Sequence, residues 1–242
     1  MENPEVAIAI QNELLHDIAL LLAVSTSSPF WEGDNTGLAS SRVTVFEALP
    51  TGGSPQLVHD WNEFCELVET LKKAEAITSL KDLWWDIRPS PRYGTIEIRI
   101  CDGLATLRET ADIVALAQAL AKRAGARVAA GQGRSFPPMW RVRENKWRAS
   151  RFGMDSELVI SNDGSHAPAR LHLTKTLDEL IADGHLDGHS RHVAHLRAIA
   201  GGAPTSAERQ RAIFAATNSL EAVAKSVADE FEEDVLAGTG AR

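Results

Sequence analysis

The feature that most constrains the fold is a pair of short β-branched segments joined by a very short turn. The segments are Leu83 to Arg88 and Thr95 to Cys101, and the letters between them are PSPRYG. So short a connection permits antiparallel pairing, whereas parallel strands need a crossover of about a dozen residues or more. Elsewhere helices and short strands are mixed without regular alternation. We therefore expect an α+β fold, with an antiparallel sheet on one side and helices on the other.

Apolar spacing and capping residues predict the remaining elements. The segment RVTVFEAL, residues 42–49, alternates and is rich in β-branched residues, which predicts a strand. Residues 25–37 form a loop rich in turn-forming residues. From Lys175 the chain is mostly helical, with breaks at its glycines. Further helices are expected over residues 4–24, 60–73, 106–130 and 138–152.

The paired segments also repeat an acid–x–Arg pattern, at Asp86 and Arg88 and again at Glu97 and Arg99. Residues two apart share one face of a strand. A register that places Arg88 opposite Glu97 also places Asp86 opposite Arg99, so each charge faces its opposite. One interpretation is a solvated sheet face with weak surface ion pairs.

The alternative is a polar face that lines a cavity, and the choice of basic residue favours it. Arginine occupies all three basic positions of this region, Arg88, Arg92 and Arg99. Its planar guanidinium suits bidentate binding of carboxylate or phosphate. In such a cavity carboxylates could bind Mg²⁺ and guanidiniums could bind phosphoryl oxygens.

Composition excludes several classes of function. The net charge is −8, with both signs interspersed, which argues against nucleic acid as a partner. Cys65 and Cys101 form no CxxC pair, so we interpret them as reduced thiols of a cytoplasmic protein. The most apolar stretch, Ile18 to Val24, is too short to span a bilayer, and no membrane partner is expected. No P-loop motif is present.

Two helical segments carry patterns that allow a plain and a functional interpretation. In the segment 138–152, Arg141, Asn145 and Arg148 form one stripe, beside Trp140 and Trp147. The plain interpretation places the tryptophans in the core and the arginines in water. Four histidines are three or four residues apart, a spacing that suits metal binding on a helix: His185, His189, His192 and His195. The favoured interpretation is a solvated helix with incidental histidines.

Four longer segments resemble, in order, motifs of the carboxylate–amine ligase family, also called type 2 glutamate–cysteine ligases. They are AVSTSSPFWEGDNTGLASSR, LWWDIRPSPRYGTIEIRICD, ENKWRASRFGMD and SAERQRAIFAATNSLEAVAKSVADE. The resemblance extends from near residue 1 to about residue 235. It implies a single domain over residues 1–242, with a sheet-and-helix core (1–170) and a C-terminal helical part (171–242). It also implies a fold similar to glutamine synthetase, in which a curved antiparallel sheet forms a funnel flanked by helices.

The resemblance further implies ATP-dependent amide formation through an acyl phosphate, with ATP and Mg²⁺ as cofactors. The substrates would be an amino acid or other carboxylate and an amine. Glu97 would bind the metal, and Arg99 would contact the nucleotide phosphates or the acyl phosphate, with Arg88 as a second catalytic arginine. Arg42 would grip a substrate carboxylate. The remaining candidates for binding ATP or substrate are Asp86, Asn145 and Arg148.

One departure from the family pattern affects this expectation. The family's first strand carries a run of glutamates that contributes metal ligands, and no such strand is found in this sequence. Three hypotheses follow. The chain works as a ligase in a homo-oligomer or with a complementing N-terminal chain; it is a non-catalytic interaction domain or one subunit of a split enzyme; or Met1 is not the true start.

Overall fold

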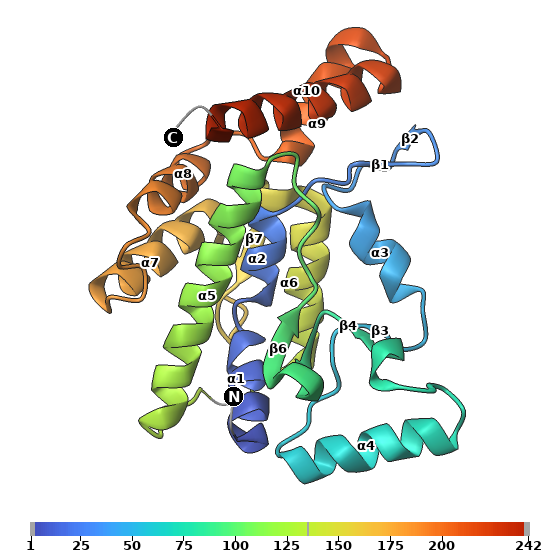
Figure 1. Ribbon diagram of the computed structural model, residues 1–242, viewed down its shortest axis with the longest axis vertical. Coiled ribbons are helices and arrows are strands. Elements are labelled where there is room, and N and C mark those ends of the chain that lie inside the picture. Colours follow the sequence, from blue (N-terminus) through green and yellow to red (C-terminus); the bar gives the residue numbers. More distant parts are fainter. Residues whose placement is uncertain (1–2, 135, 240–242) are drawn as a thin grey trace.

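The computed structural model describes residues 3–134 and 136–239 of the chain. Its centre is the short helix α2 (Ile18–Val24), whose residues are all buried. The long helix α5 (Leu107–Ala129) lies on one side of α2 and α6 (Met139–Phe152) on the other, as Figure 1 shows. Helix α7 (Ala169–Ala182) also packs against α2. The most hydrophobic segment of the sequence is therefore the core of a helical layer.

The expected helix over residues 4–24 is divided into two. Helix α1 (Pro4–Leu14) and α2 meet at an angle of 60°, and the residues between them include Asp17. The Asp17 carboxylate binds two arginines from distant parts of the chain instead of capping α2. In the described part of the chain, no single helix is long and apolar enough to cross a membrane. The bent pair of α1 and α2 passes that test only when both are taken together.

The segment predicted as a strand over residues 42–49 is instead helix α3 (Ser41–Glu47). Spacing explains the error, because Val43 and Phe46 lie three apart and share one face of a helix. Val43 is buried in the core, and the Phe46 ring stacks on Trp84 with 5.1 Å between ring centres. These tertiary contacts override the β propensity of the local sequence.

The strands do not form the single sheet that was expected. Among the described residues they form four separate two-stranded sheets, and no funnel is seen. The pairs are β1 (Phe30–Trp31) with β2 (Asp34–Asn35), β3 (Gly52–Gly53) with β4 (Trp84–Trp85), β5 (Ile87–Ser90) with β6 (Thr95–Ile98), and β7 (Glu157–Val159) with β8 (His166–Pro168).

The reason lies at Asp86, where the expected strand 83–88 changes partners. Before it, β4 pairs in parallel with β3, a short strand for which no expectation was stated. After it, β5 pairs antiparallel with β6, as predicted. The parallel pair is possible because helix α4 (Trp61–Lys73) lies in the long crossover between its strands. The α+β class is confirmed, but the extended sheet is not.

The helix boundaries agree well with their sequence signals. Asp60 caps α4 by accepting from the amide of Glu63, and Thr106 caps α5 in the same way. Gly153, with φ of 55°, ends α6. The C-terminal region is helical with breaks at the expected glycines. Its helices after α7 are α8 (Ser190–Ala200), α9 (Ser206–Thr217) and α10 (Leu220–Thr239), and short turns occur at η1 (Leu80–Asp82), η2 (Pro91–Tyr93) and η3 (Gly153–Asp155).

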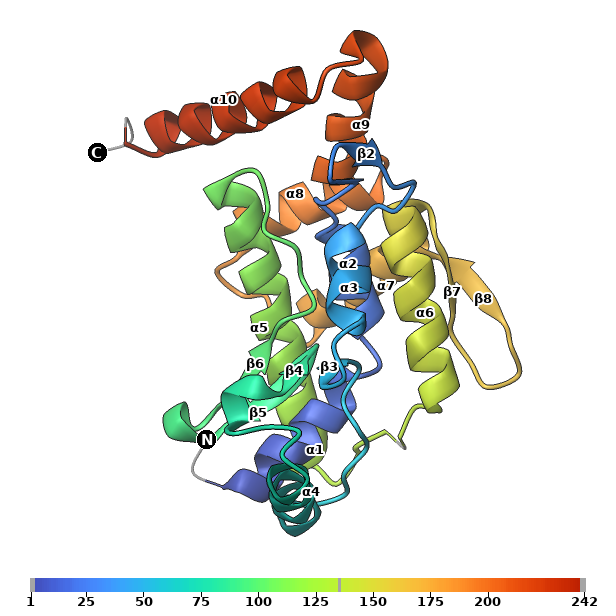
Figure 2. The same cartoon turned by 90° about the vertical axis from the view of Figure 1, so that its right-hand side faces the viewer.

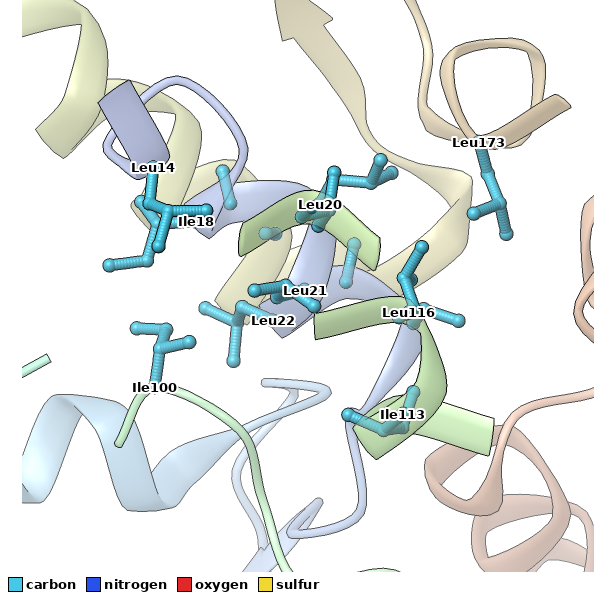
Figure 3. Packing of buried hydrophobic residues seen from close by; sticks show 14 of the residues in the cluster. Leu14, Ile18, Leu20, Leu21, Leu22, Ile100, Ile113, Leu116 and Leu173 are labelled. Atoms are coloured by element: carbon cyan, nitrogen blue, oxygen red, sulfur yellow. The ribbon is translucent and has the colours of Figure 1, made fainter. Parts of the chain in front are cut away.

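A main hydrophobic core surrounds α2, as Figure 3 shows for its leucines and for Ile100, Ile113, Leu116 and Leu173. A smaller cluster beneath α4 contains Phe64 and Trp85. The plain interpretation of α6, with its tryptophans in the core, is wrong. Trp140 is 52% exposed and Trp147 53% exposed, so this face of α6 is turned outward.

Candidate active site

The β5–β6 hairpin has the predicted register. Arg88 lies opposite Glu97, and Ser90 lies opposite Thr95. The same alignment continues past the strand ends, where the amide of Arg99 donates to the carbonyl oxygen of Asp86 at 2.7 Å. Charged side chains that are far apart along the hairpin thus gather on one ionic face.

Glu97 is the most contacted carboxylate of the hairpin. Its Oε2 accepts from Nε of Arg88 at 2.8 Å, and its Oε1 accepts from Oγ of Ser90 at 3.2 Å. Nη1 of Arg99 lies 3.6 Å from Oε2. Partial burial raises the pKa of Glu97, but Arg88, Ser90 and Arg99 together outweigh it, and the net pKa is lowered. Glu97 is therefore ionised at neutral pH.

Arg88 holds both the Glu97 carboxylate and a stretch of backbone. Its Nη1 donates to the carbonyl oxygens of Leu80 at 2.5 Å, Leu83 at 2.6 Å and Lys81 at 3.2 Å. The side chain is buried. In this structure Arg88 therefore positions Glu97 and fixes η1 beside the hairpin, and its expected catalytic contact stays a prediction.

Arg99 lies at one end of a stack in which two aromatic rings lie between two guanidinium groups. Its guanidinium carbon is 5.5 Å from the centre of the Trp84 ring, and Trp84 stacks on Phe46. Arg42 covers the same Phe46 ring at 5.5 Å. The Arg99 side chain is 35% exposed, and among the described carboxylates only Glu97 lies within 4 Å of it. Such contacts orient a guanidinium without consuming its hydrogen-bond donors.

Arg42 ties the start of α3 to the end of the hairpin strand. Its Nε donates to Oδ1 of Asp102 at 2.8 Å. Its Nη2 donates to three successive carbonyl oxygens, those of Arg99, Ile100 and Cys101. A role in gripping a substrate carboxylate stays a prediction, because most of the donors of Arg42 already have partners within the chain.

Asp102 binds several residues of the loop that precedes α3. Sequence reasoning did not single out this residue. Its carboxylate is buried and accepts from the backbone amide of Ser27 and from the hydroxyls of Ser28 and Ser40, at 2.8–2.9 Å. The signal in the sequence was the row of serines on both sides of the SPFW motif, since hydroxyls grouped in this way can surround a buried carboxylate.

Lys146 on α6 is the second residue that sequence reasoning missed. It is only 1% exposed, and its Nζ lies 2.5 Å from Oδ2 of Asp86 and 2.8 Å from Oε1 of Glu47. Burial raises the pKa of Asp86 above its usual range, because it outweighs the opposing effect of Lys146, and the charge of Glu47 adds to the increase. Lys146 thus joins α3, α6 and the junction of β4 and β5.

The structure does not bring Asn145 and Arg148 to this ionic face. The Asn145 side chain donates to the carbonyl oxygen of Val159 at 2.8 Å and accepts from the amide of the same residue at 2.7 Å. Arg148 binds Glu144 and the carbonyl oxygen of Glu157. Both therefore face β7, on the side of α6 away from α3, as Figure 2 shows for the elements. Their binding roles stay predictions.

A hollow of about 410 Å³ lies beside the hairpin, between it and the end of α4. Arg88 and Glu97 line it, together with Lys72, Ser79, Lys81 and Arg92. Its size is within the range of ligand pockets, and its walls carry an excess of positive charge. Arg99 is not among the lining residues, so the hollow and the Arg99 stack are separate features, and Glu97 belongs to the first and lies close to the second.

The described residues do not by themselves fit a Mg²⁺ ion. They contain no group of three or more His, Cys, Asp or Glu side chains that could hold a metal. The oxygens of Glu97 already accept from Arg88 and Ser90, and Asp86 is bound by Lys146. A Mg²⁺ ion takes a near-octahedral set of oxygen ligands, so a site that includes Glu97 would need ligands from elsewhere.

The histidines of α8 are not incidental, which corrects that expectation. His192 and His195 each bind the buried carboxylate of Asp112 on α5 through Nδ1, the first at 2.5 Å. They dock α8 onto α5. His185 and His189 lie outside this contact.

Comparison with known proteins identifies the family. The model of Glutamate-cysteine ligase family 2 (GCS2) matches residues 2–228. The chain belongs to this family. The GCS2 match includes all three parts of the candidate site. These are the hairpin with Arg88, Glu97 and Arg99, the loop bound by Asp102, and the helix that carries Lys146.

Curated relatives in the GCS2 family are considerably longer. A protein of Bdellovibrio bacteriovorus, "Putative glutamate--cysteine ligase 2", is 46% identical over 97% of this chain and 62% of its own length. Proteins of Thermobifida fusca and Frankia alni with names of the same form are 42% and 44% identical, over 93% and 76% of this chain. The chain spans between 48% and 62% of the length of these relatives.

Proposed function

We propose that this chain carries the phosphate-handling part of an ATP-dependent carboxylate–amine ligase active site. Membership of GCS2 supports the reaction class, and the ionic face of the β5–β6 hairpin supports the location. The observation that carries the proposal is the arrangement around Glu97, in which Arg88 fixes the carboxylate and Arg99 remains partly exposed beside it. The substrates would be a carboxylate such as glutamate and an amine such as cysteine.

In the first step of this reaction, a carboxylate oxygen attacks the γ-phosphorus of ATP and the bond to ADP breaks, which gives an acyl phosphate. In the second step, an amine attacks the acyl carbon, phosphate leaves and an amide forms. Arg99 would bind the phosphoryl oxygens that carry charge in both steps, because its guanidinium is oriented by Trp84 and only loosely paired with Glu97. Arg88 would act by positioning Glu97.

The metal ligands of this site would come in part from outside the described residues. We propose that a complementing N-terminal segment, whether of this protein or of another chain, adds strands and carboxylates beside the hairpin and so completes a funnel. The length of the curated relatives supports this, because they contain residues that the present chain does not match. A cytoplasmic location agrees with the free thiols of Cys65 and Cys101.

A second candidate function is that of a non-catalytic interaction domain or a subunit of a split enzyme. The observation that favours it is the internal pairing of the candidate site, where Arg88, Asp86 and Arg42 already have partners within the chain. A face whose charges are satisfied internally can serve as a stable docking surface without any chemistry.

Isothermal titration with ATP, with and without Mg²⁺, tests the proposal. We expect Arg99→Met to weaken binding roughly tenfold or more, because charge-assisted contacts contribute about 1.5–3 kcal/mol. Arg197→Met on α8, which removes a surface guanidinium paired with Asp178, is the matched control and should leave binding unchanged. Absence of ATP binding by the wild-type chain, or equal losses in both variants, would favour the interaction domain.

A further inference from the structure

A second candidate site lies on the opposite side of α6 from the ionic face of the hairpin. A largely enclosed hollow of about 100 Å³ is found where α1 meets α2, bounded by α6, β7 and α7. Its polar lining consists of His16, Asp17, Arg134, Arg141, Asn145 and His172. Ile18, Val142 and Leu158 give it aliphatic walls. The proposed ligase chemistry uses none of the charged groups of this hollow.

The carboxylates around the hollow are fully neutralised. Asp17 binds Nη2 of Arg123 at 2.9 Å and Nη2 of Arg134 at 3.0 Å. Burial alone would raise the pKa of Asp17, but the two guanidiniums outweigh it and lower the pKa below its usual range. Glu13 binds Arg134 at 2.5 Å and Arg127 at 3.3 Å. Asp17 therefore remains charged, and both carboxylates already accept from arginines, so they offer no free acceptor for a cation.

Arg141 gives the hollow a positive charge that no described carboxylate neutralises. It lines the hollow and donates to the side-chain oxygen of Asn162 at 3.0 Å, and its Nη2 lies 3.4 Å from His16. Among the described residues, no carboxylate lies within ion-pair distance of it. The surrounding network contains four guanidiniums (Arg123, Arg127, Arg134, Arg141) and three carboxylates (Glu13, Asp17, Glu179), which leaves one positive charge, at the wall of the hollow.

The size and the lining restrict the ligand. A cavity of about 150 Å³ holds a molecule of about six non-hydrogen atoms, so this hollow suits a ligand of about four to six. Guanidinium and imidazole groups recognise oxyanions. Asn145 keeps the wall rigid, because its side-chain amide donates to the carbonyl oxygen of Val159 and accepts from the amide of the same residue. Aliphatic walls allow, but do not require, a short carbon chain on the anion.

We propose that this hollow binds a small oxyanion, either inorganic phosphate or a short-chain carboxylate, with Arg141 as its principal contact. The site is separate from the ATP-binding face and does not depend on the proposed ligase function.

Titration calorimetry with inorganic phosphate and, separately, with acetate tests the site and distinguishes the two sources of oxyanion. We expect saturable binding of at least one of them at millimolar concentration, weakened roughly tenfold by Arg141→Gln. Arg141→Lys should retain most of the binding, since it keeps the charge. The matched control is Arg143→Gln, which removes an exposed arginine of the same helix and should have no effect.

Circular dichroism of each variant verifies that α6 is intact, and Arg141→Lys keeps the test valid if Arg141→Gln perturbs the fold. Binding that survives Arg99→Met but not Arg141→Gln supports the site independently of the ligase proposal. The proposal is overturned if neither anion saturates the wild-type chain, or if Arg141→Gln and Arg143→Gln weaken binding equally.

Discussion

Lys146 is held between two carboxylates in a place that water hardly reaches. Its side chain is 2% exposed and that of Asp86 10% exposed, whereas Glu47 is partly open to solvent. A buried charge pair offers little advantage over an apolar pair of the same shape, but removing one partner leaves the other charge without compensation. The ion pair therefore fixes where α3, α6 and the hairpin meet more than it adds to stability.

Replacing Lys146 with Met should consequently destabilise the chain by about 3–5 kcal/mol, the usual effect of breaking a buried ion pair. Urea denaturation followed by circular dichroism measures the change. Lys122→Met, at an exposed position of α5, is the control and should change the free energy of unfolding by less than about 0.5 kcal/mol. Adding Asp86→Asn to Lys146→Met should restore part of the loss. Equal effects of the two lysine substitutions would contradict this role for Lys146.

At the residue level, the sequence was sufficient where the information is local. The pairing of Arg88 with Glu97 follows from a short turn and alternating charges, both visible within nineteen letters. The partners of Lys146 and Asp102 could not be deduced in this way. Asp86 is sixty residues from Lys146, and Ser27 is seventy-five residues from Asp102, so these contacts depend on how distant elements pack.

Among the elements, helices with strong caps were predictable and short strands were not. Asp60 and Thr106 mark helix starts because their side chains accept from backbone amides three residues on, and Gly153 marks a helix end through its backbone conformation. These signals depend only on nearby residues. Helix α3 and the parallel β3–β4 pair depend on contacts with α6 and Trp84, which no local pattern contains. The extended funnel sheet was inferred from family resemblance, and the described strands are too short and too separate to form it.

The docking of α8 onto α5 depends on two histidines that bind one carboxylate. The hydrogen bond to Asp112 is the main cause that raises the pKa of His195; partial burial and Arg209 oppose it, and the charges of Asp112 and Glu109 add to it. The folded chain therefore retains the proton on His195 to higher pH than the unfolded chain does. By linkage, the protonated His195 side chain stabilises the folded chain. This stabilisation is fully present below the unfolded pKa of about 6.5, and it is lost as the pH rises through the folded pKa.

We therefore expect the free energy of unfolding to fall between pH 6 and pH 9 more steeply for the wild type than for His195→Asn. The Asn side chain keeps a donor near the position of Nδ1 but does not titrate. Urea denaturation at a series of pH values gives the slopes, and His185→Asn, outside the Asp112 contact, should retain the wild-type slope. Identical slopes for the wild type and His195→Asn would exclude His195 as the source of the pH dependence.

For the whole molecule, the outer face of α6 is an aromatic surface that the fold leaves uncovered. Trp147 and Phe152 meet edge to face with 5.9 Å between ring centres, and Trp140 lies two turns before Trp147 on the same helix. All three are about half exposed. Large apolar patches at the surface of a soluble chain mark interaction sites more often than chance. A second copy of the chain is the occupant whose binding to this face can be tested directly.

If α6 is a contact surface between copies, the isolated chain should self-associate through it. We expect light scattering after size exclusion to give a molar mass that rises above that of the monomer with increasing concentration, because burying the aromatic rings removes apolar surface from water. Replacing Trp147 with Glu, and Trp140 with Glu in addition, should return the chain to a monomer without loss of helical circular dichroism. Leu171→Glu, an exposed apolar position on α7, is the matched control and should leave association unchanged. A chain that is monomeric at every concentration, or association that survives both tryptophan substitutions, would show that α6 does not mediate contacts between copies.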